Sequence, residues 1–415
     1  MVPPPNIVGA LSASPLERPA LLEGRWLAGD HSQAIAALGP ISCLEGDPST
    51  LAGLPDWLTW HARRYPEGGA IGYLCYELAR AFERVPLWPD GRLPEFSFAY
   101  YPRLERIRKN REWAPACPPD SGDAEIVAGF DRAQFLADVE RIREYIAAGD
   151  IYQANLTQQF IARLHGQTPE SLYVYLAKSS APMRAFLNTP HAAIISNSPE
   201  RFFHLRGNRI LTSPIKGTIL RRGDPVEDSR LRAMLLASPK DRAENVMIVD
   251  LLRNDLGRIC YYDTIRTRLY EVETLPHLFH LVSHVEGKLR PELGPLEVLR
   301  ALFPCGSVTG APKVRAMEIL AELESSPRGV AMGAVGIILG APGSRRFEMD
   351  FNVAIRTMIV RDGLATLRVG CGIVYDSNPE SEYAEMLLKA RPLLASLGLQ
   401  TQSERRQPEV VATER

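Results

Sequence analysis

A lysine that could act as a nucleophile stands at position 216, inside the segment Pro-Ile-Lys-Gly-Thr at 214–218. Gly217 follows it directly, and because glycine has no Cβ, a small molecule can come close to the chain there. A free lysine has a pKa of about 10.4 and attacks only as the neutral amine, so this role near neutral pH needs desolvation or neighbouring cations. Most lysines that follow a strand are solvated surface charges. The role of Lys216 therefore depends on what surrounds it.

Two pairs of carboxylates are spaced to share a helix face. Asp241 and Glu244 stand three residues apart, as do Glu382 and Glu385, and this spacing places both members of a pair on one side of a helix. Four carboxylate groups would suit Mg²⁺, which takes oxygen ligands. Acidic residues in a first helical turn are also ordinary partners of the helix dipole. Both interpretations remain open for these residues.

Helix signals surround both acidic pairs. Ser238 with Pro239 is a typical helix start, and the sequence predicts a helix that ends around 254–257. A second helix is predicted from Asn378 to a stop at Gly398. A third is predicted from a capping box of Asp131 and Gln134 to a stop at Gly149.

Strand signals fill most of the chain between these helices. Alternation predicts strands at 151–163 and 192–212, the latter with a hairpin turn at Gly207-Asn208, and a β-meander at 329–374 with a hairpin turn at Asp362-Gly363. Strands joined by tight turns are antiparallel. We therefore expect antiparallel sheets.

Two features of the predicted meander could serve a ligand. Arg356, expected on a strand at 352–357, could bind a carboxylate with both arms of its guanidinium, although a solvent-facing strand arginine is more common. Gly370 and Gly372 flank Cys371 inside a strand. They indicate either the floor of a small-molecule site or a simple bulge.

Composition narrows the class of protein. The 415 residues are 45% hydrophobic and 23% charged, with a net charge of -1, which gives no reason to expect a nucleic-acid or acidic-membrane partner. The six cysteines form no CxxC pair, and this argues against a zinc ribbon or a disulfide framework. Neither a signal peptide nor a membrane-spanning stretch is recognisable. We expect a cytoplasmic protein.

The pattern divides the chain into three parts. We expect an N-terminal subdomain at 1–125, which includes a Pro-rich and charged linker at 103–122, a catalytic domain at 126–398 and a flexible tail at 399–415.

Two further motifs carry less weight. The segment 306–313 fails the phosphate-loop pattern. His277, His280 and His284 have spacings that a zinc site could use, but histidines in an apolar stretch are more often core residues.

Taken together, these segments resemble the chorismate-utilising enzymes. The resemblance is densest from 130 to 397 and rests on the segments 149–156, 198–200, 214–218, 242–245, 250–258, 310–317, 355–357 and 370–389. It implies an α+β fold, a sandwich of two large antiparallel β-sheets with helices outside and two intertwined subdomains. The hairpin signals agree with that architecture.

Two positions distinguish members of this family. Isochorismate and salicylate synthases carry a lysine, thought to activate water, where this chain has Gln153, and a neutral amide cannot act as that base. Anthranilate synthases carry alanine at the position of Lys216, whereas Pro-Ile-Lys-Gly-Thr is typical of aminodeoxychorismate synthases. The resemblance therefore favours amination of chorismate on the route to para-aminobenzoate and folate. An anthranilate synthase component, or a non-catalytic chorismate-binding protein, remains the alternative.

The resemblance also implies roles for individual residues. Lys216 would attack carbon 2 of chorismate while Glu200 protonates the departing 4-hydroxyl, and ammonia would then replace the lysine by adding at carbon 4. Lys389 could instead simply pair with Glu385. Glu244 and Glu385 would bind Mg²⁺, supported by Asp241 and Glu382. Arg356 and Lys389 would bind carboxylates. The pocket would be lined by Gln153, Thr218, His280 and Ser307, with a floor of Gly370 and Gly372. No glutaminase-like module is recognisable, so ammonia would come from a glutaminase partner subunit.

Overall fold

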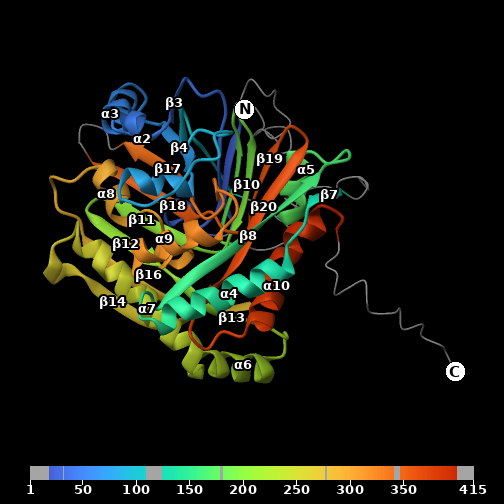
Figure 1. Cartoon of the computed structure of the whole chain (residues 1–415). Helices are drawn as coiled ribbons and strands as arrows, with labels where there is room; N and C mark the ends of the chain where they lie inside the picture. The colour runs from blue at the N-terminus through green and yellow to red at the C-terminus, as the bar shows by residue number, and fades with distance from the viewer. Residues whose placement is uncertain are drawn as a thin grey trace.

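Two ten-stranded sheets, in which every strand pairing is antiparallel, form the body of the chain (Figure 1). The computed structural model describes residues 18–30, 32–108, 124–177, 181–275, 278–340 and 346–399. In order, the first sheet consists of β16 (Gly310–Ala311), β8 (Gln153–Arg163), β20 (Leu364–Ile373), β19 (Thr357–Arg361), β10 (Ala193–Ser198), β9 (Met183–Asn188), β1 (Ala20–Gly24), β2 (Gln33–Ala37) and β6 (Glu105–Arg108), with β7 (Glu125–Ala128) paired to β8.

The second sheet carries the strand of Lys216. In order, it consists of β13 (Ile215–Leu220), β15 (Leu278–Lys288), β12 (Arg209–Ser213), β11 (Arg201–Arg206), β18 (Phe347–Val353), β17 (Ala334–Gly340), β4 (Gly69–Leu74), β5 (Phe96–Tyr101) and β3 (Ser42–Gly46), with β14 (Arg266–Thr274) paired to β15. The N-terminal strands are divided between the sheets, because β1, β2 and β6 join the first and β3, β4 and β5 the second.

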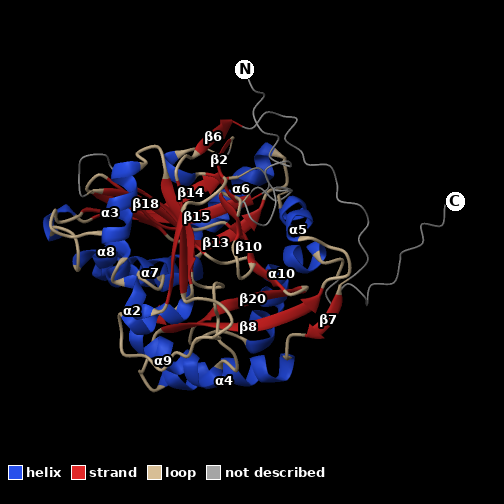
Figure 2. Cartoon of the chain, turned by 90° about the horizontal axis from the view of Figure 1, so that it is seen from above, coloured by secondary structure: helices blue, strands red, loops and turns tan. Residues whose placement is uncertain are grey.

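Helices cover the outer faces of the sheets (Figure 2). The α-helices are α2 (Pro48–Leu51), α3 (Leu54–Arg64), α4 (Arg132–Ala147), α5 (Pro169–Leu176), α6 (Pro225–Ala237), α7 (Pro239–Gly257), α8 (Pro295–Leu302), α9 (Lys313–Leu323) and α10 (Pro379–Ser396). Short 3₁₀ turns are η2 (Trp26–Ala28), η3 (Tyr76–Ala81), η5 (Tyr262–Thr264) and η6 (Gly306–Val308).

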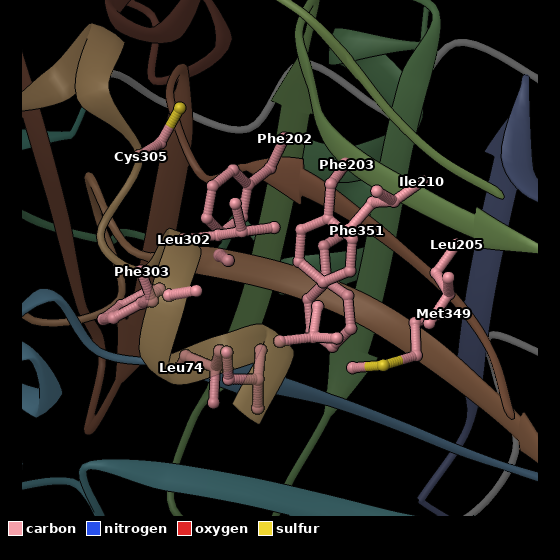
Figure 3. Close-up of a cluster of buried hydrophobic side chains, with 14 of the residues drawn as sticks. Leu74, Phe202, Phe203, Leu205, Ile210, Leu302, Phe303, Cys305, Met349 and Phe351 are labelled. Carbon is pink, nitrogen blue, oxygen red and sulfur yellow. The ribbon is translucent and has the colours of Figure 1, made fainter. Parts of the chain in front are cut away.

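Three large hydrophobic clusters show the layering. One joins strands of both sheets, for example Leu22 of β1 and Ile337 of β17, and so fills the space between them. A second packs α4, α5, α9 and α10 on the first sheet. The third packs α3, α7 and α8 on the second sheet and contains the stacked rings of Phe203 and Phe351, whose centroids are 5.2 Å apart (Figure 3). The expected α+β sandwich with helices outside is confirmed.

The predicted helices are present. Asp131 caps α4 and accepts a hydrogen bond from the Gln134 N–H. The reciprocal half of the predicted capping box is wrong, because the Gln134 amide donates to Asp138 on the next turn instead. Ser238 caps α7, and Asn378 caps α10.

The predicted meander is wrong as a single unit. Its first two strands, β17 and β18, pair within the second sheet, whereas β19 and β20 belong to the first. Arg356 therefore lies at a crossing between the sheets rather than on a strand, with a φ of 50°. The predicted linker was also partly wrong, because Glu105–Arg108 pairs with β2 as β6.

A second crossing lies beside the first. The chain passes from β10 of the first sheet to β11 of the second through Pro199 and Glu200. Backbone hydrogen bonds fasten the two crossings, since the Asn197 N–H donates to the Arg356 carbonyl and the Val353 N–H donates to the Glu200 carbonyl. Two segments far apart in sequence are thus held together where the sheets meet.

Candidate active site

Lys216 lies in a partly enclosed position beside an acidic helix. Its Nζ is 3.5 Å from Oε2 of Glu244 on α7, and the two side chains are 13% and 14% exposed. The register of β13 on β15 shifts between Ile215 and Thr218, and Gly217 has a φ of 82°. A Cβ on Gly217 would stand 2.9 Å from Cγ of Asp241, so glycine permits α7 to approach the strand.

Glu200 is a buried carboxyl group with an unused oxygen. It is 5% exposed, and its Oε1 has no hydrogen-bond partner among the described residues. Burial raises the pKa of Glu200 to about 7, while hydrogen bonds from the Ser307 hydroxyl and the Ile215 N–H and the charge of Lys216 act in the opposite direction. A carboxyl group with this pKa is partly protonated near neutrality and can donate a proton.

Gln153 presents an unused amide to the same pocket. Its side chain is fully buried, and neither Nε2 nor Oε1 has a partner in the described part of the chain. A Cβ added to Gly372 would lie 2.6 Å from Nε2 of Gln153 and 3.5 Å from Nζ of Lys216. The side chains of Gln153 and Lys216 therefore both approach the backbone at Gly372. Buried polar groups without partners are rare in folded proteins, and a ligand is one way to satisfy them.

Glycine is required at the two positions of β20 for different structural reasons. The pairing of β20 with β8 runs without a register shift, with Gly370 opposite Thr157 and Gly372 opposite Asn155, so the bulge interpretation does not apply to this pairing. A Cβ on Gly370 would meet the Leu156 carbonyl oxygen at 2.0 Å. Gly370 thus permits a close backbone approach within the sheet, whereas Gly372 permits the side chains of Gln153 and Lys216 to approach the strand.

His280 closes the pocket as a neutral imidazole. Its Nδ1 lies 2.8 Å from Oγ1 of Thr218, and its Nε2 is buried without a partner among the described residues. Burial, aided by the charge of Arg356, lowers the pKa of His280 to about 4. His284 instead contacts Ser213 and Glu271, and His277 lies outside the described residues. Within the described chain, the group of potential metal ligands contains no histidine, which gives no support to the zinc interpretation.

The two candidate carboxylate-binding cations differ in what they contact. The guanidinium of Arg356 has no hydrogen-bond or ion-pair partner in the described chain, and burial lowers the pKa of this residue. Lys389 is already engaged, because its Nζ lies 2.8 Å from Oε1 of Glu385 and donates to the Gly370 carbonyl at 3.2 Å. Arg356 is therefore the freer of the two to receive a carboxylate.

The two acidic helix starts face one another. Nζ of Lys240, on α7, lies 3.8 Å from Oε1 of Glu382, on α10, and so bridges the two helices. Ligand atoms of Cys371, Glu382 and Glu385 lie within 4.8 Å of one another. Asp241 and Glu244 are not members of that group. The starts of the two acidic helices thus lie close together, but the described side chains do not gather all four carboxylates around one point.

The carboxylates at the two helix starts are suitable ligands for a hard divalent cation. Carboxylate oxygens are the ligands that Mg²⁺ prefers, whereas a thiol such as that of Cys371 suits softer metals. Three ammonium groups already sit next to these carboxylates, since Lys216 contacts Glu244, Lys240 contacts Glu382 and Lys389 contacts Glu385. The site therefore attracts positive charge.

Some contributors could not be found by sequence reasoning. The contact of Lys240 with Glu382 leaves no signal in the sequence, because Glu382 lies on a helix far away in the chain and a Lys-Asp dipeptide is ordinary. The Ile215 N–H, which hydrogen-bonds to Glu200, is a backbone group and leaves no trace in the residue types. Both depend on tertiary packing.

Comparison with known proteins decides the family. Residues 49–395 match the family described as chorismate binding enzyme. The chain belongs to this chorismate-binding enzyme family. Curated relatives of this family member include anthranilate synthase component 1 of Streptomyces coelicolor, 39% identical over 80% of this chain and 73% of the relative. Aminodeoxychorismate synthase component 1 of Escherichia coli K12 is 36% identical over 80% of this chain and 77% of the relative.

Solved structures agree with the family assignment. The crystal structure of anthranilate synthase component I from Streptococcus pneumoniae superposes with a TM-score of 0.73 at 28% identity, covering 88% of this chain and 92% of that one. Within the described residues of this chorismate-binding family member, no helix combines the length and apolar character needed to cross a bilayer.

Proposed function

We propose that the chain aminates chorismate with ammonia to give 4-amino-4-deoxychorismate and water. The observation that carries the proposal is the position of Lys216, whose Nζ lies 3.5 Å from the point where a Cβ of Gly372 would stand. The amine thus borders the space that also meets the unpartnered amide of Gln153. A nucleophile and a neutral amide in one enclosed pocket suit attack by an amine better than attack by water.

The chemistry divides between Lys216 and Glu200. In the first step the Lys216 nitrogen bonds to carbon 2 of the ring, both ring double bonds shift, and the bond from carbon 4 to its hydroxyl breaks. Glu200 supplies the proton with which that hydroxyl leaves as water. The proton that Nζ of Lys216 loses as its bond forms returns to the Glu200 carboxylate. A carboxyl group with a pKa of about 7 can supply the first proton at neutral pH.

The second step restores the enzyme. Ammonia bonds to carbon 4 and gives up a proton, both ring double bonds shift back, and the bond between carbon 2 and Nζ breaks as Lys216 takes up that proton. Two substitutions replace one difficult displacement, which is the usual advantage of covalent catalysis. A neutral His280, whose Nε2 has no partner within the described part of the chain, can contact the substrate without adding charge.

The remaining groups bind and orient the substrate. The guanidinium of Arg356, which has no ion-pair partner among the described residues, can hold a carboxylate through two hydrogen bonds. Glu244 and Glu385, with Asp241 and Glu382 behind them, would hold Mg²⁺, which supplies positive charge for the ring carboxylate of chorismate. Lys216, Lys240 and Lys389 must then move away from these carboxylates.

The ammonia would come from a second protein. Relatives of both kinds are named as component 1, and we expect a glutaminase subunit to act with this chain. The test is to incubate purified protein with chorismate, Mg²⁺ and ammonium, and separately with glutamine and a candidate glutaminase. 4-Amino-4-deoxychorismate, detected by a coupled lyase, is the expected product; anthranilate or isochorismate as the main product would reject the assignment.

Anthranilate synthesis is the second candidate. It is favoured by relatives named anthranilate synthase, which are as similar to this chain as those named aminodeoxychorismate synthase. The lysine at position 216 favours the first candidate, because anthranilate synthases resemble the chain but carry alanine there. The same product analysis separates the two.

A further inference from the structure

A buried arginine behind the pocket contacts two of its walls at once. Arg328, in the loop between α9 and β17, is 4% exposed. Its guanidinium donates a hydrogen bond of 2.6 Å to the Val308 carbonyl and one of 2.7 Å to the Asn155 carbonyl. These two carbonyls belong to η6 and β8, which approach the pocket from different parts of the sequence.

Each carbonyl lies close to a group that faces the substrate space. Val308 directly follows Ser307, whose hydroxyl hydrogen-bonds to Glu200. Asn155 lies two residues beyond Gln153 on β8 and pairs with Gly372 of β20. We propose that Arg328 is a positioning residue, which sets the distance between the Ser307–Glu200 side of the pocket and the Gln153–Gly372 side.

The guanidinium itself is held on three sides. Glu324 accepts hydrogen bonds of 2.7 Å from both Nε and one terminal nitrogen of Arg328, and the ring of Tyr76 lies 4.3 Å from its central carbon. Glu324 also accepts from the N–H and hydroxyl of Thr157, which ties the group to β8. A planar fork with five donors is needed for these contacts, and a lysine in its place cannot make them together.

A purely structural role predicts a different outcome. Buried ion pairs often add little net stability and can be replaced by apolar side chains at small cost. Glu324 also pairs with the buried Arg368 at 3.5 Å, so it keeps a cationic partner when Arg328 alone is replaced. If Arg328 served only a structural role, the activity of its variants would fall only as far as the unfolded fraction rises. If Arg328 positions the two walls, kcat would fall in protein that remains folded.

The test compares Arg328→Lys and Arg328→Met, both of which keep Glu324, with the wild type. Arg141→Lys is a matched control, because Arg141 is 53% exposed and contacts Glu144 and the ring of Tyr145 on its own helix, α4. The inference rests on the proposed function only in needing chorismate as substrate, so activity is measured as chorismate consumption, whichever product forms. Folding is checked by circular dichroism.

We expect both Arg328 variants to lower kcat by about tenfold to a hundredfold, the loss that a small misplacement of reacting groups produces. KM for chorismate should change less than kcat, because Arg356 is untouched. The fall of activity at high pH should move to higher pH, since a weaker Ser307 hydrogen bond no longer opposes the raised pKa of Glu200. A kcat close to that of the wild type, or a loss that only follows the unfolded fraction while the pH profile stays fixed, would overturn the inference.

A second measurement does not need turnover. Hydrogen–deuterium exchange of peptides that cover 305–311 and 153–157 should be faster in Arg328→Lys than in the wild type, and unchanged in Arg141→Lys. Unaltered exchange in both segments would overturn the positioning role. A protein that consumes no chorismate but shows the faster exchange would reject the proposed function and leave the positioning role standing.

Discussion

Nζ of Lys216 lies 3.5 Å from Oε2 of Glu244, an ion pair that joins the strand of the proposed nucleophile to the helix of the proposed metal ligands. The contact depends on Gly217, because a side chain there would meet Asp241 and push α7 away from β13. Nucleophile and acidic site are therefore one structural unit. Altering the cation at the acidic helices should alter the behaviour of the lysine pocket.

Replacing Glu200 by glutamine should remove the general acid. We expect a loss of kcat of about 10²- to 10⁴-fold, the usual contribution of a positioned acid or base. In the wild type, kcat/KM should fall as the pH rises through about 7, because Glu200 loses its proton there. The residual activity of the variant should lack that fall. Steady-state rates over a range of pH values check this, and a descending limb that persists unchanged in the variant would assign it to another group.

Stability should also depend on Glu200. Its pKa is about 7 in the folded chain and about 4.3 when unfolded, so the folded form binds more protons between these values. The free energy of unfolding should accordingly fall as the pH rises through this window and level off above it. Glu77, whose pKa burial also raises to about 7, acts in the same direction.

The Glu200→Gln variant should therefore lose less stability than the wild type between about pH 5 and pH 8. Urea unfolding at the two pH values measures this difference. Glu67→Gln, a change at an exposed position, should keep the pH dependence of the wild type. Equal pH dependence in all three proteins would mean that Glu200 does not bind an extra proton on folding.

Adding a methyl group at Gly372 should displace the side chain of Gln153 next to Lys216. The new Cβ would lie 2.6 Å from Nε2 of Gln153, and such overpacking costs about 1–3 kcal/mol. We expect KM for chorismate to rise by about tenfold, which corresponds to about 1.4 kcal/mol. Gly129→Ala is the control, because its Cβ would make only an ordinary contact with Ile126 at 3.9 Å. A KM that stays the same in Gly372→Ala would place the substrate elsewhere.

Removing the ammonium of Lys240 should favour metal binding. This group lies 3.8 Å from Oε1 of Glu382 and bridges α7 to α10, so it competes with a metal ion for the same carboxylate. We expect Lys240→Met to bind Mg²⁺ severalfold more tightly, measured by calorimetry without substrate. Lys288→Met, at an exposed position on β15, serves as control. Weaker or unchanged Mg²⁺ binding in Lys240→Met would contradict competition at Glu382.

Local signals in the sequence predicted the helices well. Asp131, Ser238 and Asn378 each cap the helix that the pattern assigned to them, because capping depends on residues within one turn. The hairpin turns at Gly207 and Gly363 were also correct. Each of these features is decided by neighbouring residues.

Long-range pairing could not be predicted in the same way. Alternation at 329–374 identified strands but not their partners, so the passage from β18 to β19 between the two sheets was missed. The same limit applies to the site. Residue types pointed to Lys216 and the resemblance to chorismate-utilising enzymes pointed to Glu200, but the contacts of Lys240 and Arg328 depend on segments that only the folded chain brings together.

The most direct test is the intact mass of the protein after reaction with chorismate and Mg²⁺ without ammonia, followed by peptide mapping. Covalent catalysis by Lys216 predicts an adduct on this residue that disappears when ammonium is added and releases 4-amino-4-deoxychorismate. Lys216→Ala, with folding checked by circular dichroism, should form no adduct and should lose most of its amination activity. A Lys216→Ala protein that aminates chorismate at the wild-type rate would show that Lys216 is not the nucleophile.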